Sequence, residues 1–232
     1  MARALKDAVE PAEEGATPKR RRRLSYDERR AEFVTKAIEF FAQEGFESST
    51  RELARRLNVT QPLLYRYFPS KEDLISEVYE TVYVQRWREE WGVLLQDRSR
   101  PIRDRMIEFY QAYTDAIFRD DWMRIFLFSG LKGIGLNKRY LRVVRERILE
   151  TILREILHER GYAEKEPSEE EIEFAWTIHG GVFYYGVRML IYKASVHNDK
   201  TFVIEMSVDC LLNQFDAVHN RARAARADTN EA

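Results

Sequence analysis

The stretch SSTRELARRLNVTQPLLYRYF constrains the fold of this chain more than any other, because it predicts two short helices joined by a tight turn. Ser49 followed three residues later by Glu52 is the pattern of a capping box, which begins a helix. Asn58 is one of the few residues that tolerate a left-handed backbone, so it suits the turn. Thr60 can cap the second helix, with Pro62 in the first turn of that helix.

The flanking segments also have helical periodicity. The pattern changes at Asp27. The apolar residues that then recur at helical spacing are Phe33 or Val34, Ala37, Ile38 and Phe41, and Gly45 is a typical helix stop. Ser70 begins a further helix, which is predicted to continue to about Gln96. A longer helix followed by two short ones is the helix-turn-helix arrangement. The remaining helices are predicted over about 101–119, 121–130, 137–160, 169–194 and 200–222. No segment alternates with period two over a strand length, so the sequence predicts an all-α protein of about nine helices.

Charge and cysteine content limit the class of protein. The net charge is only -1, but residues 19–23 (KRRRR) are basic and residues 164–173 (EKEPSEEEIE) are acidic. This separation indicates a basic end that meets a polyanion and a second region with another task. Cys210 is the only cysteine, so an intrachain disulfide is excluded. The chain shows neither a signal peptide nor an apolar run long enough to span a bilayer, and we expect a cytoplasmic protein without a membrane partner.

Residues 33–80 (FVTKAIEFFAQEGFESSTRELARRLNVTQPLLYRYFPSKEDLISEVYE) resemble the N-terminal DNA-binding domain of the TetR/AcrR family of transcriptional regulators. The resemblance includes Phe-Ala-x-x-Gly-Phe and Leu-Tyr-x-Tyr-Phe-x-Ser-Lys-Glu-x-Leu. It implies a three-helix helix-turn-helix domain, a C-terminal helical bundle and a homodimer held by a four-helix bundle. The expected domains are a disordered basic arm (1–26), a DNA-binding domain (27–75, extending into a linking helix to about 96), a ligand-binding and dimerisation domain (97–222) and a disordered tail (223–232).

The expected DNA contacts lie mainly on the second short helix. A recognition helix reads base edges in the major groove, where Gln61 can pair with adenine and Leu63 can touch a thymine methyl. Tyr65, Tyr67 and Lys71 resemble the phosphate contacts of the family. Relatives often have other residues at 58, 62 and 63, so base preference does not transfer. The full expected set is Arg20, Arg21, Arg22, Arg23, Ser49, Thr50, Arg51, Thr60, Gln61, Pro62, Leu63, Tyr65, Arg66, Tyr67 and Lys71.

The four arginines of this set have a second interpretation, which is a solvated basic tail with only nonspecific affinity for DNA. By spacing alone, Leu64 and Phe68 lie four residues apart and are predicted to enter the core behind the recognition helix.

The C-terminal part is rich in aromatic residues, which form a pocket, a core or an interface. The resemblance implies an effector pocket, with Phe109, Tyr113, Trp122, Arg124, Phe126, Trp176 and His179 as expected ligand-binding residues. Residues 174–192 (FAWTIHGGVFYYGVRMLIY) are apolar nearly all round, so helices 169–194 and 200–222 are expected to form the dimer interface. The expected interface residues are Phe174, Gly181, Val182, Tyr185 and Met189.

The leading hypothesis is a ligand-responsive DNA-binding regulator, most simply a repressor released from a pseudo-palindromic operator by a small apolar or aromatic effector. The alternative is an effector-independent regulator or architectural DNA binder whose C-terminal domain only dimerises. Enzyme activity finds no support, because the glycines at 130, 133 and 135 do not fit a phosphate loop and the histidines lack metal-ligand spacing. No cofactor or metal is therefore expected. The sequence does not identify the effector or the operator.

Overall fold

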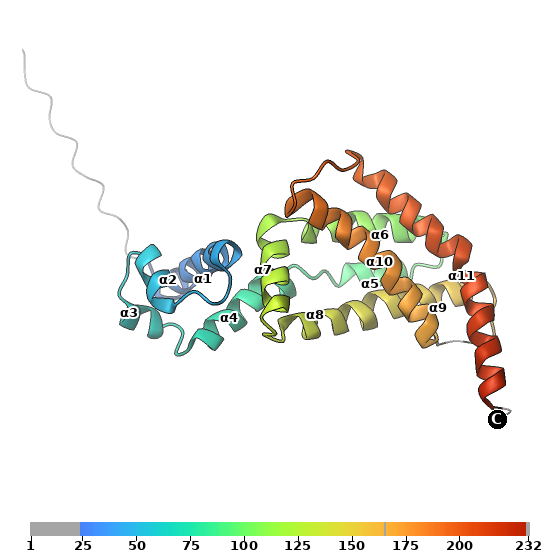
Figure 1. Cartoon of the computed structure of the whole chain (residues 1–232), viewed down its shortest axis with the longest axis horizontal. Coiled ribbons are helices and arrows are strands. Elements are labelled where there is room, and N and C mark those ends of the chain that lie inside the picture. The colour runs from blue at the N-terminus through green and yellow to red at the C-terminus, as the bar shows by residue number, and fades with distance from the viewer. Residues whose placement is uncertain (1–23, 165, 231–232) are drawn as a thin grey trace, which may run out of the picture.

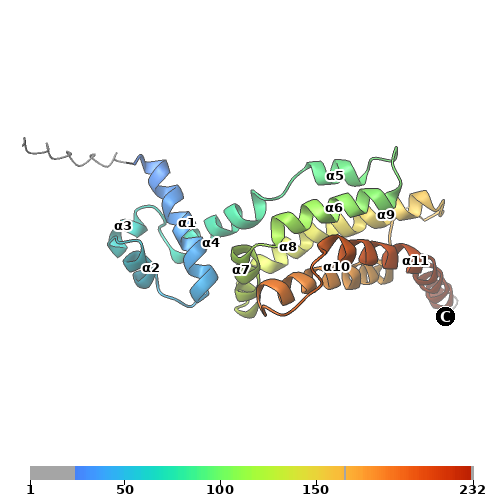
Figure 2. The same cartoon turned by 90° about the horizontal axis from the view of Figure 1, so that it is seen from above.

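The computed structural model describes residues 24–164 and 166–230, and within these ranges every regular element is a helix (Figure 1). The predicted all-α class is confirmed. Helices α1 to α4 form a small head at one end, and the later helices form a longer bundle beside it (Figures 1 and 2). None of the described helices is both long and apolar enough to cross a membrane.

The head contains α1 (Tyr26–Glu44), α2 (Thr50–Arg56), α3 (Gln61–Tyr65) and α4 (Lys71–Tyr79). Gly45 ends α1 with a positive φ of 72°, as its role as a helix stop predicts. Asn58 has a φ of 53° between α2 and α3, so the predicted left-handed turn is confirmed. Leu64 and Phe68 are both buried in the head, as their spacing predicts.

Capping begins these helices, with one difference from the sequence prediction. Ser70 forms a complete capping box with Asp73 at the start of α4. Ser49 accepts a hydrogen bond from the Glu52 amide at 3.2 Å, but the Glu52 carboxylate pairs with Arg55. Ser49 is therefore a simple N-cap, because the exposed carboxylate has an ionic partner one turn along its own helix.

The predicted single helix from Ser70 to Gln96 is wrong. After α4 the chain continues through a π-helical segment, η1 (Glu80–Val84), leaves helical geometry and then forms α5 (Glu90–Leu95) at the edge of the bundle (Figure 2). Trp91 on α5 is buried, with its ring edge-on to Phe109 and Tyr113 at centroid distances of 6.0 and 5.5 Å. The break lets this indole turn into the bundle.

The bundle consists of α6 (Ile102–Ile117), α7 (Asp120–Leu131), α8 (Leu136–Val144), α9 (Glu150–Glu159), α10 (Glu169–Leu190) and α11 (Lys200–Asn230). A second π-helical segment, η2 (Arg145–Leu149), joins α8 to α9, so the helix predicted over 137–160 is continuous but irregular. Arg105 and Glu155 form a buried ion pair of 3.0 Å between α6 and α9, which fixes these two helices side by side.

The sequence predicted disorder at both ends of the chain. The structure corrects this prediction at the C-terminal end, and most of the N-terminal arm lies outside the described residues. Helix α11 continues to Asn230, so the disordered tail expected over 223–232 is wrong for residues 223–230. The segment RARAARA is rich in strong helix formers, which explains why the helix continues. The expected basic arm, including Arg20, Arg21, Arg22 and Arg23, lies outside the described residues apart from its last positions.

Candidate nucleic-acid interface and interior chamber

Helices α2 and α3 enclose a wide, open depression of about 810 Å³ on the surface of the head. Five of the expected DNA contacts line it: Arg51, Thr60, Gln61, Pro62 and Leu63. Arg55 and Asn58 also line this surface, although the sequence did not single them out as DNA contacts. The only sequence signal for them is their place one turn after Arg51 and at the turn itself. These five expected contacts therefore share one concave face.

Thr50 lies beneath this face and connects its side chains. Its side chain is buried, and its Oγ1 accepts a hydrogen bond from Gln61 Nε2 at 3.0 Å. The Tyr65 hydroxyl lies 2.9 Å from the same oxygen. Thr50 was expected to touch DNA, but the structure places its hydroxyl in a network that orients Gln61 and Tyr65. Ser49 is exposed at the start of α2.

The remaining expected contacts lie at the end of α3 and the start of α4. Arg66 is exposed at the C-cap of α3. The Tyr67 ring is half-buried and stacks on Tyr26, with ring centroids 4.5 Å apart. Lys71 is the first residue of α4, and its ammonium donates a hydrogen bond to the Phe46 carbonyl. This bond ties the start of α4 to the chain that follows α1.

A cavity of about 180 Å³ opens between the helices of the bundle, and we call it the aromatic chamber. Helices α6, α7, α8 and α10 each contribute to its wall. Five expected ligand-binding residues line it: Tyr113, Trp122, Phe126, Trp176 and His179. The sequence missed the other lining residues, which are Tyr140, Leu141, Val144, Gly180 and Phe183. Their helical spacing on α8 and α10 was the available signal, since Tyr140 and Val144, like Trp176 and Gly180, are four residues apart.

Two expected ligand-binding residues do not line this chamber. Phe109 is fully buried and stacks behind Tyr113, with ring centroids 5.5 Å apart. Arg124 pairs with Asp120 at 2.9 Å along the outer side of α7. Residues two positions apart on a helix point in different directions, so Arg124 does not share the direction of Trp122.

The polar side-chain groups of the lining residues are tyrosine hydroxyls, indole N–H groups and one imidazole, and no charged side chain is among them. The Tyr113 and Tyr140 hydroxyls are 2.9 Å apart. His179 Nδ1 lies 3.4 Å from the Tyr110 hydroxyl. Burial lowers the pKa of His179 to about 4 and raises the pKa of Tyr113 well above its ordinary value. The lining is therefore uncharged at neutral pH.

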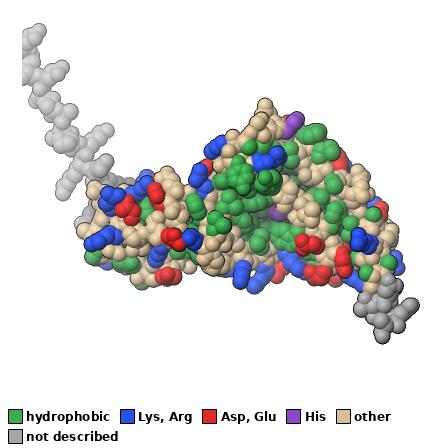
Figure 3. Space-filling view, in the orientation of Figure 1, with side chains coloured by type: hydrophobic (Ala, Val, Ile, Leu, Met, Phe, Trp, Pro, Cys, Tyr) green, Lys and Arg blue, Asp and Glu red, His purple; other side chains and the backbone are tan. Residues whose placement is uncertain are grey.

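The expected dimer residues of α10 divide between two faces. Gly181 is exposed, and Phe174 and Met189 are half-buried. Val182 and Tyr185 are each only 3% exposed and pack inside their own chain, so their assignment to an interface is wrong. The exposed apolar side chains on this side are Tyr184, Tyr192, Phe202 and Met206, on α10, α11 and the loop between them. Figure 3 shows hydrophobic side chains gathered over this region.

Comparison with known proteins supports the sequence resemblance. Residues 33–78 match the family model described as "Bacterial regulatory proteins, tetR family". No curated protein matches the chain.

Solved structures of TetR-family transcriptional regulators share the fold over most of the chain. One from Pseudomonas syringae pv. tomato has a TM-score of 0.56 and 18% identity, covering 80% of this chain and 95% of its own. One from Mesorhizobium loti has a TM-score of 0.54 and 16% identity, covering 82% and 98%. One from Streptomyces coelicolor has a TM-score of 0.58 and 16% identity, covering 88% and 87%. Residues 33–78 are therefore similar to the tetR family of bacterial regulatory proteins, and the chain has the fold of solved TetR-family regulators.

Proposed function

We propose that this protein is a repressor that a small, uncharged aromatic effector releases from its operator. The observation that carries this proposal is the position of the aromatic chamber on α7. Trp122 and Phe126 face the chamber, and the C-terminal end of the same helix packs against the head. A ligand in the chamber therefore acts on a helix that touches the DNA-binding domain.

The contact between α7 and the head is close. Phe128 lies over Gly45, where an added Cβ would meet the phenyl ring at 3.4 Å. Lys132, just beyond α7, pairs with Glu47 in the loop after α1. A displacement of α7 would thus move α1 and the start of α4, which Lys71 ties to Phe46. The effector shifts the equilibrium only by its difference in affinity for the two arrangements.

The chamber wall defines the class of effector. Aromatic rings supply most of the lining, and the Tyr113 and Tyr140 hydroxyls and the neutral His179 imidazole supply hydrogen bonds. An ionic group would enter without a counter-charge, which is costly in an apolar site. We therefore infer a neutral aromatic molecule with a hydroxyl or carbonyl group.

On DNA, we propose that α3 enters the major groove. Gln61 reads a base edge from its place above Thr50, and Leu63 lies beside it on the same concave face. Arg66, Tyr67 and Lys71 hold phosphates and fix the register without reading sequence. A homodimer built from α10 and α11 presents two such heads to two half-sites.

A two-stage experiment tests this function. An operator is first selected from random duplex DNA with the full chain, and its affinity is measured by fluorescence anisotropy. A panel of neutral one- and two-ring phenols and aryl ketones is then screened by thermal shift, since a ligand that binds only the folded state stabilises it. We expect stabilising compounds to release the operator.

Two matched variants test whether the compounds release the operator by binding in the aromatic chamber. Phe183→Ala on the chamber wall should keep operator affinity and lose release, while Val93→Ala on the exposed side of α5 should change neither. Stabilisation without release, or no stabilisation by any compound, would favour the effector-independent regulator instead.

A further inference from the structure

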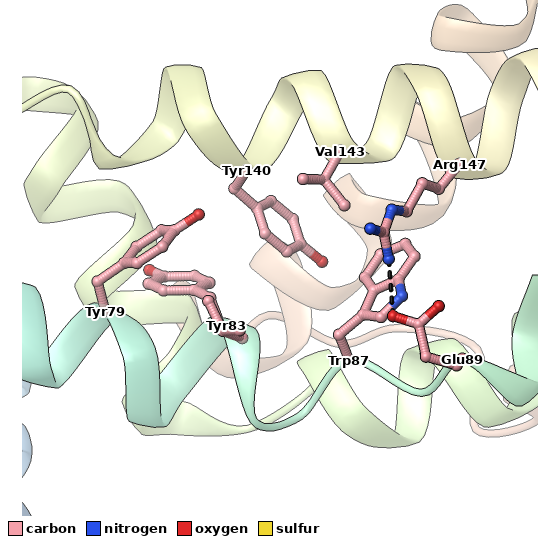
Figure 4. Close-up of a pocket in the computed structure, with 8 residues that line it drawn as sticks. Tyr79, Tyr83, Trp87, Glu89, Tyr140, Val143 and Arg147 are labelled. Carbon is pink, nitrogen blue, oxygen red and sulfur yellow. Dashed lines mark hydrogen bonds and ion pairs between the residues drawn. The ribbon is translucent and has the colours of Figure 1, made fainter.

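A second cavity, which we call the linker groove, lies outside the aromatic chamber. It has a volume of about 220 Å³ and opens to the surface between the linker that follows α4 and the α8–η2 helix. Figure 4 shows Tyr79 and Tyr83 on one wall, Tyr140 and Arg147 on the other, and Trp87 at one end. The Tyr140 ring lines both cavities. None of the other groove residues lines the chamber.

Three of the groove residues lie on segments with an unusual backbone. Tyr83 and Val84 belong to η1, and Arg147 belongs to η2. π-helical turns account for well under 1% of residues in globular proteins and occur frequently at functional sites. Two such segments, far apart in sequence, each contribute to the lining of this one cavity.

The aromatic side chains that line the groove favour a planar ligand. The Tyr83 and Tyr140 centroids are 5.3 Å apart, and the Trp87 indole closes one end. Aromatic faces of this kind accept a planar ring by stacking or edge contacts. The small volume limits the ligand to one or two fused rings, since pockets for drug-sized molecules are typically larger, about 300–1,000 Å³.

The charged group that the fold holds at the groove is a cation, the guanidinium of Arg147. Arg147 lies on the continuous α8–η2–α9 helix, and its guanidinium is 5.8 Å from the centre of the Trp87 ring. Its partner, Glu89, lies 2.8 Å away at the end of the non-helical linker, with a side chain 81% exposed. An exposed pair of this kind is weak, so another carboxylate can replace Glu89. A ligand cation would instead have to displace Arg147 from the indole.

We propose that the linker groove binds a small planar aromatic carboxylate, with its ring among Tyr83, Trp87 and Tyr140 and its carboxylate paired with Arg147. Arginine can hold a carboxylate through two parallel hydrogen bonds, which gives this group direction as well as charge. The ligand takes the place of Glu89 and thereby frees the linker between α4 and α5. The site shares only the Tyr140 ring with the aromatic chamber, and its ligand is charged whereas the effector proposed for the chamber is uncharged.

The test uses 2-naphthoate and the full chain, with binding measured by isothermal titration calorimetry at low salt and without DNA. We expect saturable binding with one site per chain. Arg147→Met should weaken it at least tenfold, and Glu89→Gln should tighten it several-fold because it removes the competing carboxylate. The tightening cannot come from misfolding, and thermal melting checks that Arg147→Met is folded.

Phe183→Ala, which alters only the chamber, should leave the affinity for 2-naphthoate unchanged. Absence of binding up to millimolar 2-naphthoate overturns the proposal. So does binding that both the Arg147 and Glu89 variants leave unchanged, or binding that Phe183→Ala abolishes. Because the measurement contains no DNA, its failure is distinct from failure of effector-driven operator release.

Discussion

The imidazole of His179 lies among the rings of Tyr110, Tyr113 and Trp176, with centroid distances of 5.9, 5.5 and 5.7 Å. In this apolar environment a charged imidazole is costly, and burial lowers the pKa to about 4. The sequence suggested a ligand contact for His179, and the structure gives this residue a buried position on the chamber wall.

This pKa predicts acid sensitivity. Between about pH 6.5 and pH 4 the unfolded chain binds a proton at His179 that the folded chain does not, so the free energy of unfolding falls as pH is lowered through this window. The full effect is roughly 3 kcal/mol, and it is absent above about pH 6.5. Thermal melts from pH 4.5 to 7.5 should show a smaller loss for His179→Gln than for the wild type. Parallel curves of Tm against pH for the two proteins would contradict the low pKa assigned to His179.

A second prediction at this scale concerns Thr50. Thr50→Val keeps the shape of the side chain and removes the oxygen that orients Gln61 and Tyr65. We expect operator affinity to fall about fivefold, equivalent to the loss of about 1 kcal/mol, which is typical of one hydrogen bond. Thr35→Val is the matched control, because Thr35 is exposed on α1 and only bonds its own helix. Equal affinities for all three proteins would show that the network does not support DNA binding.

Single residues also show what sequence reasoning reaches and what it misses. The burial of Leu64 and Phe68 was predictable, because a spacing of four places both on one side of a helix. The hydrogen bond from Gln61 to Thr50 was not, since the two side chains come from different helices and meet only when these pack together. Interior pockets have the same limit. Periodicity identifies the apolar face of each helix, but it does not show where packed helices leave a cavity between them.

At the scale of an element, α10 is apolar nearly all round but has two different sides. Gly186 faces the core so closely that an added Cβ would lie 2.5 Å from the Phe118 ring. Gly180 and Gly181 face open space, with no atom within 4 Å of an added Cβ. The glycines therefore serve different purposes. Gly186 admits a ring against the helix backbone, Gly180 lines the aromatic chamber, and Gly181 is exposed on the side where we propose a partner chain.

The close contact at Gly186 gives a stability prediction. Gly186→Ala should destabilise the fold by about 1–3 kcal/mol, because the ring of Phe118 must move within a packed core. For a chain of this size that is a fall in Tm of several degrees, at roughly 2–4 °C per kcal/mol. Gly92→Ala on α5 is the control, since its Cβ would meet only Gln96 Nε2 at 3.9 Å. A Tm for Gly186→Ala at or above that of the wild type would show that Phe118 relaxes freely.

The break between η1 and α5 shows how tertiary contacts override local pattern. The sequence from Ser70 to Gln96 has no proline and only Gly92 as a glycine, so local signals predict one helix. The structure instead directs Arg86 to Asp121 on α7, at 2.7 Å, and buries Trp91 against α6. These partners are distant in sequence, and no local pattern encodes them.

At the scale of the whole molecule, the chain presents an apolar side formed by α10 and α11. Phe202 and Met206 lie four residues apart on α11, and their side chains are 48% and 54% exposed. Tyr184 on α10 is 52% exposed. The sequence indicated that α10 must be covered on both sides, but it did not show which residues face outwards. For that reason Val182 and Tyr185, which face the core, were assigned to the wrong side.

This side gives the last prediction. Met206→Glu places a charge at the centre of the proposed interface, where two copies related by two-fold symmetry would each bury it. Light scattering should report a dimer for the wild type and a monomer for Met206→Glu, with unchanged helical content by circular dichroism. Val93→Glu is the matched control, because Val93 is a 73% exposed apolar residue on α5, away from α10 and α11, and this variant should stay dimeric.

The same variant should lose most of its affinity for a two-half-site operator, because each head alone binds one half-site without the advantage of linkage to the other. Its affinity for a single half-site should stay unchanged, since α3 and its support by Thr50 are untouched. A Met206→Glu protein that remains dimeric and binds the full operator normally would place the interface on another side of the molecule.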